Sequence, residues 1–142
     1  MTSRLQDCGR SLRALPRWVQ VWIGGFLIPV NTLPFFMLDT PTGKAAALAA
    51  IFVVLTNVPI MLQQRGMSRL MSVPHLIAWV PLLGYLGARV LFGPDMSGIE
   101  LLLAIALILI NGASLVFDTL DSWRWLCGAR DIPGHLSQGA CK

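Results

Sequence analysis

Four long apolar segments separated by short polar ones organise the chain. They cover about residues 18–37, 44–62, 73–92 and 99–120. Roughly 20 helical residues, at about 1.5 Å each, are needed to cross about 30 Å of hydrocarbon, and each segment is about that long. In the last one, residues 101–110 contain no polar side chain. The pattern predicts an all-α fold, an integral membrane bundle of four antiparallel transmembrane helices with short loops.

Residues at the ends of these segments predict where the helices begin and bend. Pro29 and Pro34 remove backbone donors in the first span, so we expect a kink in its outer half. Thr40 followed by a proline is a favourable N-cap and first-turn pair for the second span. Ser97 and Glu100 form an S-x-x-E capping box, which predicts the start of the fourth span.

The second span opens on small residues, Ala45 to Ala50, which suit close contact between helices. Residues 48–57 (LAAIFVVLTN) and 102–111 (LLAIALILIN) are identical at five of ten positions. This likeness is compatible with a duplicated helical hairpin. Apolar segments also match by chance, because they use few residue types.

Composition and charge agree with a membrane protein. Of the 142 residues, 55% are hydrophobic and 13% charged, whereas soluble domains have about 25% charged residues. Nine of the 11 Lys and Arg lie in the segments 1–17, 63–71 and 121–142. The other two, Lys44 and Arg89, lie near the opposite ends of the spans. By the positive-inside rule we expect both termini in the cytoplasm, at a bacterial inner membrane. The net charge of +4 is therefore assigned to a basic membrane face and not to nucleic-acid binding.

This organisation gives one transmembrane domain, residues 18–120, between a basic segment, 1–17, and a C-terminal segment, 121–142. Residues 1–17 have leucines at helical spacing, so they form either a short helix on an anionic membrane surface or a disordered basic tail. A cleavable signal peptide fits this sequence less well, because the apolar run that follows is longer than the roughly 7 to 15 residues of a signal-peptide apolar region. Trp123 and Trp125 resemble an interfacial aromatic belt, and we expect residues 131–142 to be disordered.

Polar side chains share one helical face in each span and should point away from lipid. We predict a polar pocket that opens to the cytoplasm, with a His–Asp pair at its mouth that changes charge near neutral pH. Its residues are Asn57, His75, Asn111, Ser114 and Asp118, and a second tier comprises Asn31, Gln64, Tyr85 and Arg89. The competing interpretation, which we favour, is that the asparagines only bond across helices and the charges sit in the headgroup layer. Arg89 would then extend its side chain to the interface.

Motifs for catalysis, cofactors or metals are not found in the sequence. The three cysteines form no CxxC pair, and the two histidines lie on separate segments. The sequence has no glycine-rich phosphate loop and no G-x-S-x-G nucleophile motif. We therefore expect a protein that is not an enzyme and holds neither cofactor nor metal.

Two classes of function remain. The first is a non-catalytic subunit, assembly factor or scaffold of a membrane complex, favoured by the small size and short loops. The second is a small oligomeric transporter or channel that uses the polar pocket, since one four-helix bundle is a poor aqueous pore. Both imply the lipid bilayer and either further copies of the chain or a membrane-protein partner.

Overall fold

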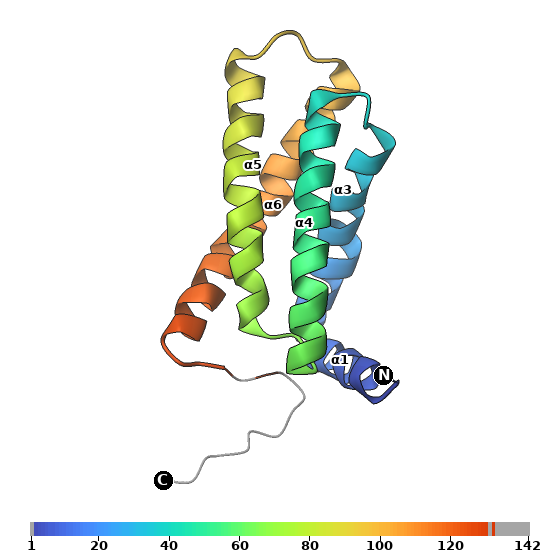
Figure 1. The fold of residues 1–142 in the computed structure, drawn as a ribbon. Coiled ribbons are helices and arrows are strands. Elements are labelled where there is room, and N and C mark those ends of the chain that lie inside the picture. Colours follow the sequence, from blue (N-terminus) through green and yellow to red (C-terminus); the bar gives the residue numbers. More distant parts are fainter. Residues whose placement is uncertain (1, 131, 133–142) are drawn as a thin grey trace.

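A computed structural model describes residues 2–130 and 132 of the chain, and every regular element in that part is helical (Figure 1). In chain order these are α1 (Thr2–Ala14), α2 (Arg17–Trp22), the π-helical turn η1 (Ile23–Leu27), α3 (Ile28–Thr32), the 3-10 turn η2 (Leu33–Phe36), α4 (Pro41–Gln64), the 3-10 turn η3 (Arg69–Met71), α5 (Ser72–Phe92) and α6 (Gly98–Leu126). The expected disorder of residues 131–142 lies outside the described residues, apart from Ile132.

Four helical segments are long and apolar enough to cross a membrane, Arg17–Phe36, Pro41–Gln64, Arg69–Phe92 and Gly98–Leu126. They stand side by side in Figure 1, with α1 across one end. Three begin and end close to the predicted spans, but α6 continues past residue 120 to Leu126. Residues 121–127 contain no glycine or proline, and the next residue, Gly128, has a φ of 95°, the left-handed conformation typical of a helix end. The C-terminal segment expected from residue 121 thus starts inside this helix.

The first apolar segment is not one regular helix. It passes from α2 through the π-helical turn η1 to α3 and ends in the 3-10 turn η2. Pro29 has no N–H, so the carbonyl one turn before it, on Gly25, cannot receive its usual helical hydrogen bond. The π-helical turn lies at that point, and Pro34 lies in the 3-10 turn. The segment therefore changes helical type twice, with the π-helical turn before the outer half in which the kink is predicted and the 3-10 turn inside it.

The core lies between α4, α5 and α6. Small residues of α4 meet larger residues of the other two helices there: Ala46, Ala50 and Val53 pack with Trp79, Leu82 and Leu86 of α5 and with Leu103, Ala104 and Leu107 of α6. The predicted small-residue face of the second span is buried, and Ala46 is fully inaccessible. The segment 17–36 has one buried residue, Pro34, so it lies at the periphery of the other three.

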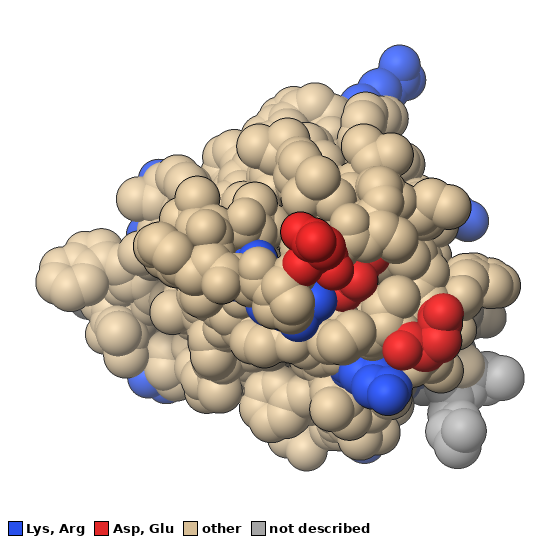
Figure 2. Space-filling model, turned by 90° about the horizontal axis from the view of Figure 1, so that it is seen from above, with Lys and Arg blue, Asp and Glu red and all other residues tan. Residues whose placement is uncertain are grey.

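The helix ends form two distinct faces. The loop end comprises the turn at 37–40 and the loop at 93–97, and the connector end comprises α1, residues 65–71 and the last turns of α6 (Figure 1). Thr40 caps α4 at the loop end, where its hydroxyl accepts from the Gly43 N–H at 3.0 Å. A Cβ on Gly43 would overlap the carbonyl oxygen of Met37, so the tight turn requires glycine at this position. Viewed from above, the loop end shows few charged groups on an otherwise uncharged surface (Figure 2).

The N-terminal segment is helical from Thr2 to Ala14, while its position on a membrane surface stays a prediction. The hydroxyl of Ser11, which is fully buried, accepts from the Met67 N–H at 2.9 Å. The Cys8 thiol contacts the Met61 carbonyl oxygen at 3.5 Å. Helix α1 is therefore attached to the end of α4 and to the residues that follow it.

Candidate functional site

Three of the predicted pocket residues form a hydrogen-bonded chain across three helices. His75 of α5 lies between Asn57 of α4 and Asp118 of α6, with Asn57 Nδ2 3.1 Å from His75 Nε2 and His75 Nδ1 3.3 Å from Asp118 Oδ1. A neutral imidazole has one donor and one acceptor nitrogen. With Nδ1–H donating to the carboxylate, Nε2 accepts from the Asn57 amide, and both contacts are satisfied. We call these three residues the histidine cluster.

The histidine cluster borders the core, and two polar atoms without hydrogen-bond partners lie in it or next to it. Its imidazole stacks on the Trp79 indole, with ring centroids 6.2 Å apart and planes 17° apart. Trp79 is 2% exposed, and its Nε1 has no hydrogen-bond partner. The Asn57 Oδ1 atom is also buried and unpartnered. The acceptor Asn57 Oδ1 and the donor Trp79 Nε1 therefore lie unpaired near the imidazole. If the Asn57 amide were rotated, its oxygen could accept a hydrogen bond from His75 Nε2–H.

Asn111 and Ser114 belong to a different group. Asn111, which is fully buried, exchanges two hydrogen bonds with Asn31 of α3, at 2.8 and 3.1 Å. Ser114 accepts from the Trp22 indole N–H at 3.3 Å. Both contacts tie the peripheral first segment to α6. The five pocket residues predicted as one set are thus divided between two sets of contacts.

The second-tier residues have different surroundings. Asn31 pairs with Asn111, as described above. Gln64 is exposed at the end of α4 and Tyr85 is 41% exposed, so neither side chain faces the interior as its helical stripe predicts. Helical periodicity puts both residues near the polar faces, but the neighbouring elements leave both side chains exposed.

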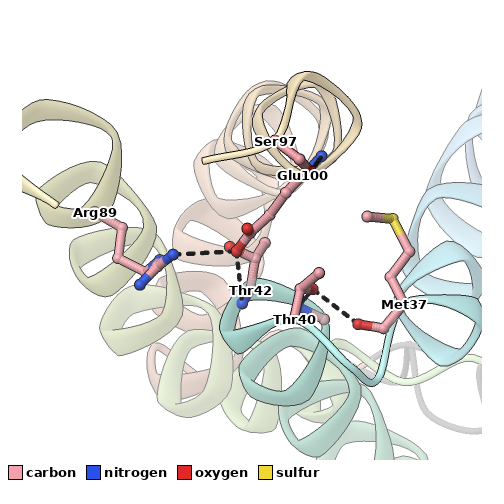
Figure 3. A network of polar contacts seen from close by, with 7 residues as sticks. Met37, Thr40, Thr42, Arg89, Ser97 and Glu100 are labelled. Carbon is pink, nitrogen blue, oxygen red and sulfur yellow. Dashed lines mark hydrogen bonds and ion pairs between the residues drawn. The ribbon is translucent and has the colours of Figure 1, made fainter. Parts of the chain in front are cut away.

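Arg89 forms an ion pair at the loop end. Its Nη2 atom lies 3.2 Å from Glu100 Oε1, and the same oxygen accepts from the Thr42 N–H at 3.3 Å (Figure 3). The side chains of Arg89 and Glu100 are 15% and 7% exposed. Arg89 therefore pairs with a carboxylate between the helices, and its expected extension to a membrane interface stays a prediction. These three residues, the arginine cluster, also take one member from each of α4, α5 and α6.

The capping box is half formed. The Ser97 hydroxyl accepts from the Glu100 N–H at 3.2 Å, as predicted. The Glu100 carboxylate, however, contacts Arg89 and Thr42. The sequence pattern indicated Glu100 only as a helix cap, and this ion pair was not predicted. The available signal was two opposite charges on opposite sides of the short loop at 93–97.

Metal binding finds no support in these contacts. Among the residues that the structure describes, no group of three or more His, Cys, Asp or Glu side chains could hold an ion. Comparisons with protein-family models, curated proteins and solved structures find no match for the chain. The geometry of the polar clusters therefore carries the functional argument alone.

Proposed function

We propose that the protein is a small polytopic membrane protein that serves as a non-catalytic subunit, assembly factor or scaffold of a membrane complex. Its four apolar segments cross the bilayer as an antiparallel bundle, with both termini on the cytoplasmic side of a bacterial inner membrane. The segments that carry most of the basic residues meet at the connector end, and this supports the orientation by the positive-inside rule.

The observation that carries the structural role is the internal pairing of polar side chains. The arginine cluster, the histidine cluster and the Asn31–Asn111 pair all bond residues of one helix to residues of another. Such contacts hold helices together in a bilayer at about 1 kcal/mol or less per hydrogen bond. The polar groups of the interior thus serve mainly to fix helix positions.

The outer surface supports association within the membrane. Large apolar side chains are exposed along the first segment, and examples are Trp18 (60%), Phe26 (48%) and Phe36 (85%). Lipid, a second copy or another membrane protein would cover this surface. The first segment contributes least to the core, so we expect a protein partner to bind there first.

Photo-crosslinking in native membranes tests the proposal. A crosslinking residue at Phe26 is expected to give a protein adduct of defined mass, while one at Leu55, an exposed residue of α4 (69%), gives lipid adducts only. Lipid adducts alone at both positions would contradict the partner assignment. Cysteine labelling at positions 124 and 95 checks orientation separately, because only position 95 should react from the outside.

A small oligomeric transporter or channel is the second candidate. The unpartnered Asn57 Oδ1 and Trp79 Nε1 beside a His–Asp pair favour it, since a bound polar group or proton could use them. Proteoliposomes that show pH-dependent uptake or leak, lost in His75→Ala and in Asp118→Asn, would support this function. Unchanged activity in both variants would exclude the histidine cluster as its site.

A further inference from the structure

One side of α1 is fixed to the rest of the protein by three separate contacts. Cys8 and Ser11 face α4 and the connector, as described above. Gly66 fits closely beneath this helix, since a Cβ there would lie 2.8 Å from the Ser11 hydroxyl oxygen. The Gln20 amide donates to the carbonyl oxygens of Arg13 and Leu15 at 3.3 and 2.8 Å, which ties the end of α1 to the first segment. The rotation of α1 about its own axis is therefore set.

The outward side of α1 separates apolar from basic side chains. Leu5 is 55% and Leu12 39% exposed, and Arg10 and Arg13 are exposed one turn apart. A shallow hollow of about 550 Å³, largely open to the outside, follows this side, and the described residues that border it all belong to α1: Leu5, Gln6, Gly9, Arg10 and Arg13. A Cβ on Gly9 would meet nothing within 4 Å, so the hollow has open space between the leucine and the arginines.

These side chains match the chemistry of an anionic phospholipid. Two guanidinium groups on adjacent turns can donate several hydrogen bonds to phosphate oxygens, and the Gln6 amide adds another donor. Leu5 and Leu12 would contact the first methylenes of the acyl chains, as in helices that lie in a membrane interface. Trp18, exposed at the start of the first segment, is suited to the same depth.

We propose that this side of α1 binds the phosphate group of an anionic phospholipid in the leaflet at the connector end. The proposal rests on the membrane insertion proposed above. The lipid is chosen over a soluble phosphate because the apolar and basic side chains are exposed together on one side of the helix. Binding would hold α1 in the plane of the interface and fix the connector end relative to the bilayer.

Lipid titration of the purified full-length protein in detergent, read by native mass spectrometry, tests the site. Wild type should bind one phosphatidylglycerol more tightly than phosphatidylcholine. The variant Arg10→Gln/Arg13→Gln should bind phosphatidylglycerol about thirty-fold more weakly, because each arginine at an anionic surface contributes about 1 kcal/mol and 1.4 kcal/mol is tenfold. The control Arg4→Gln/Arg124→Gln removes the same charge outside the hollow and should retain binding.

A second variant keeps both arginines. Gly9→Glu places a carboxylate in the hollow and replaces a helical glycine by a better helix former, so α1 should remain folded. We expect it to lose the preference for phosphatidylglycerol, while Gly98→Glu, an equal charge change at an exposed glycine at the start of α6, on the loop end, keeps it. Circular dichroism checks that helix content is unchanged.

Several results would overturn the proposal. Equal weakening in the Arg4/Arg124 control would show diffuse charge attraction without a site. Glycerol 3-phosphate that competes as well as the lipid would show a site for soluble phosphate. Unaltered lipid preference in both α1 variants would exclude this hollow. Resistance of the protein to alkaline carbonate extraction reports insertion independently, so a failed lipid site and a failed membrane assignment are distinguishable.

Discussion

The arginine cluster and the histidine cluster join the same three helices at different heights, but they do so with different chemistry. Thr42, Arg89 and Glu100 connect α4, α5 and α6 near the loop end, and Asn57, His75 and Asp118 connect them nearer the connector end. An arginine is always charged, whereas a neutral imidazole offers one donor and one acceptor nitrogen. The first cluster is thus an ion pair, and the central residue of the second can make both of its contacts without a full charge.

This difference shows that position in the bundle does not determine the role of a polar contact. Arg89 has to keep its carboxylate, because a mostly buried guanidinium without a partner is costly. The His75 ring can remain neutral and still satisfy both of its neighbours. Equal substitutions in the two clusters should therefore have unequal effects.

Glu100→Gln is expected to cause the largest loss. It keeps the size of the side chain but leaves the Arg89 charge without a counter-charge, and breaking such a pair costs about 3 kcal/mol. Unfolding by sodium dodecyl sulfate in mixed micelles, followed by tryptophan fluorescence, measures the change. A loss below about 0.5 kcal/mol would show that Arg89 is well hydrated in the wild type.

The double variant Arg89→Met/Glu100→Met should lose less stability than Glu100→Gln. Both buried charges are then absent, and apolar replacements of a buried ion pair are often close to neutral. The remaining cost comes from the Thr42 N–H, which loses its acceptor, and is about 1 kcal/mol. The same unfolding assay checks this, and a double variant less stable than Glu100→Gln would contradict the assignment.

Asp118→Asn is expected to cost about 1 kcal/mol or less at pH 8, because the amide oxygen still accepts from His75 Nδ1–H. The same unfolding assay measures the change, and the loss should be smaller than that of Glu100→Gln. A loss as large as that of Glu100→Gln would show that the Asp118 charge stabilises the bundle beyond its one hydrogen bond.

Asn57→Leu should have the smallest effect. It removes one hydrogen bond to His75, and it also removes the buried Oδ1 that has no partner, so the two changes nearly cancel. We expect a change below about 0.5 kcal/mol at neutral pH. A loss as large as that of Glu100→Gln would mean that the Asn57 amide holds more of the structure than its one contact indicates.

Hydrophobic patterning predicted the position of all four apolar helices, because a membrane-spanning helix requires a long apolar run and local breakers limit its ends. The Thr40 cap and the distortion at Pro29 followed from the same local rules. The end of α6 was less predictable. Residues 121–126 are polar and aromatic, yet they continue the helix, and Asp121 pairs with Arg69 of η3 at 3.5 Å.

By itself, the sequence determined the helical class, the four apolar segments, the sorting of charge and which polar residues share a side of their own helix. Only the tertiary structure decided which polar residues meet: Arg89 with Glu100, Asn31 with Asn111, and His75 between Asn57 and Asp118. Helical periodicity sets the direction of a side chain about its own helix. The relative height and rotation of neighbouring helices, which decide the partner, come from packing of residues such as Ala46, Trp79 and Leu107.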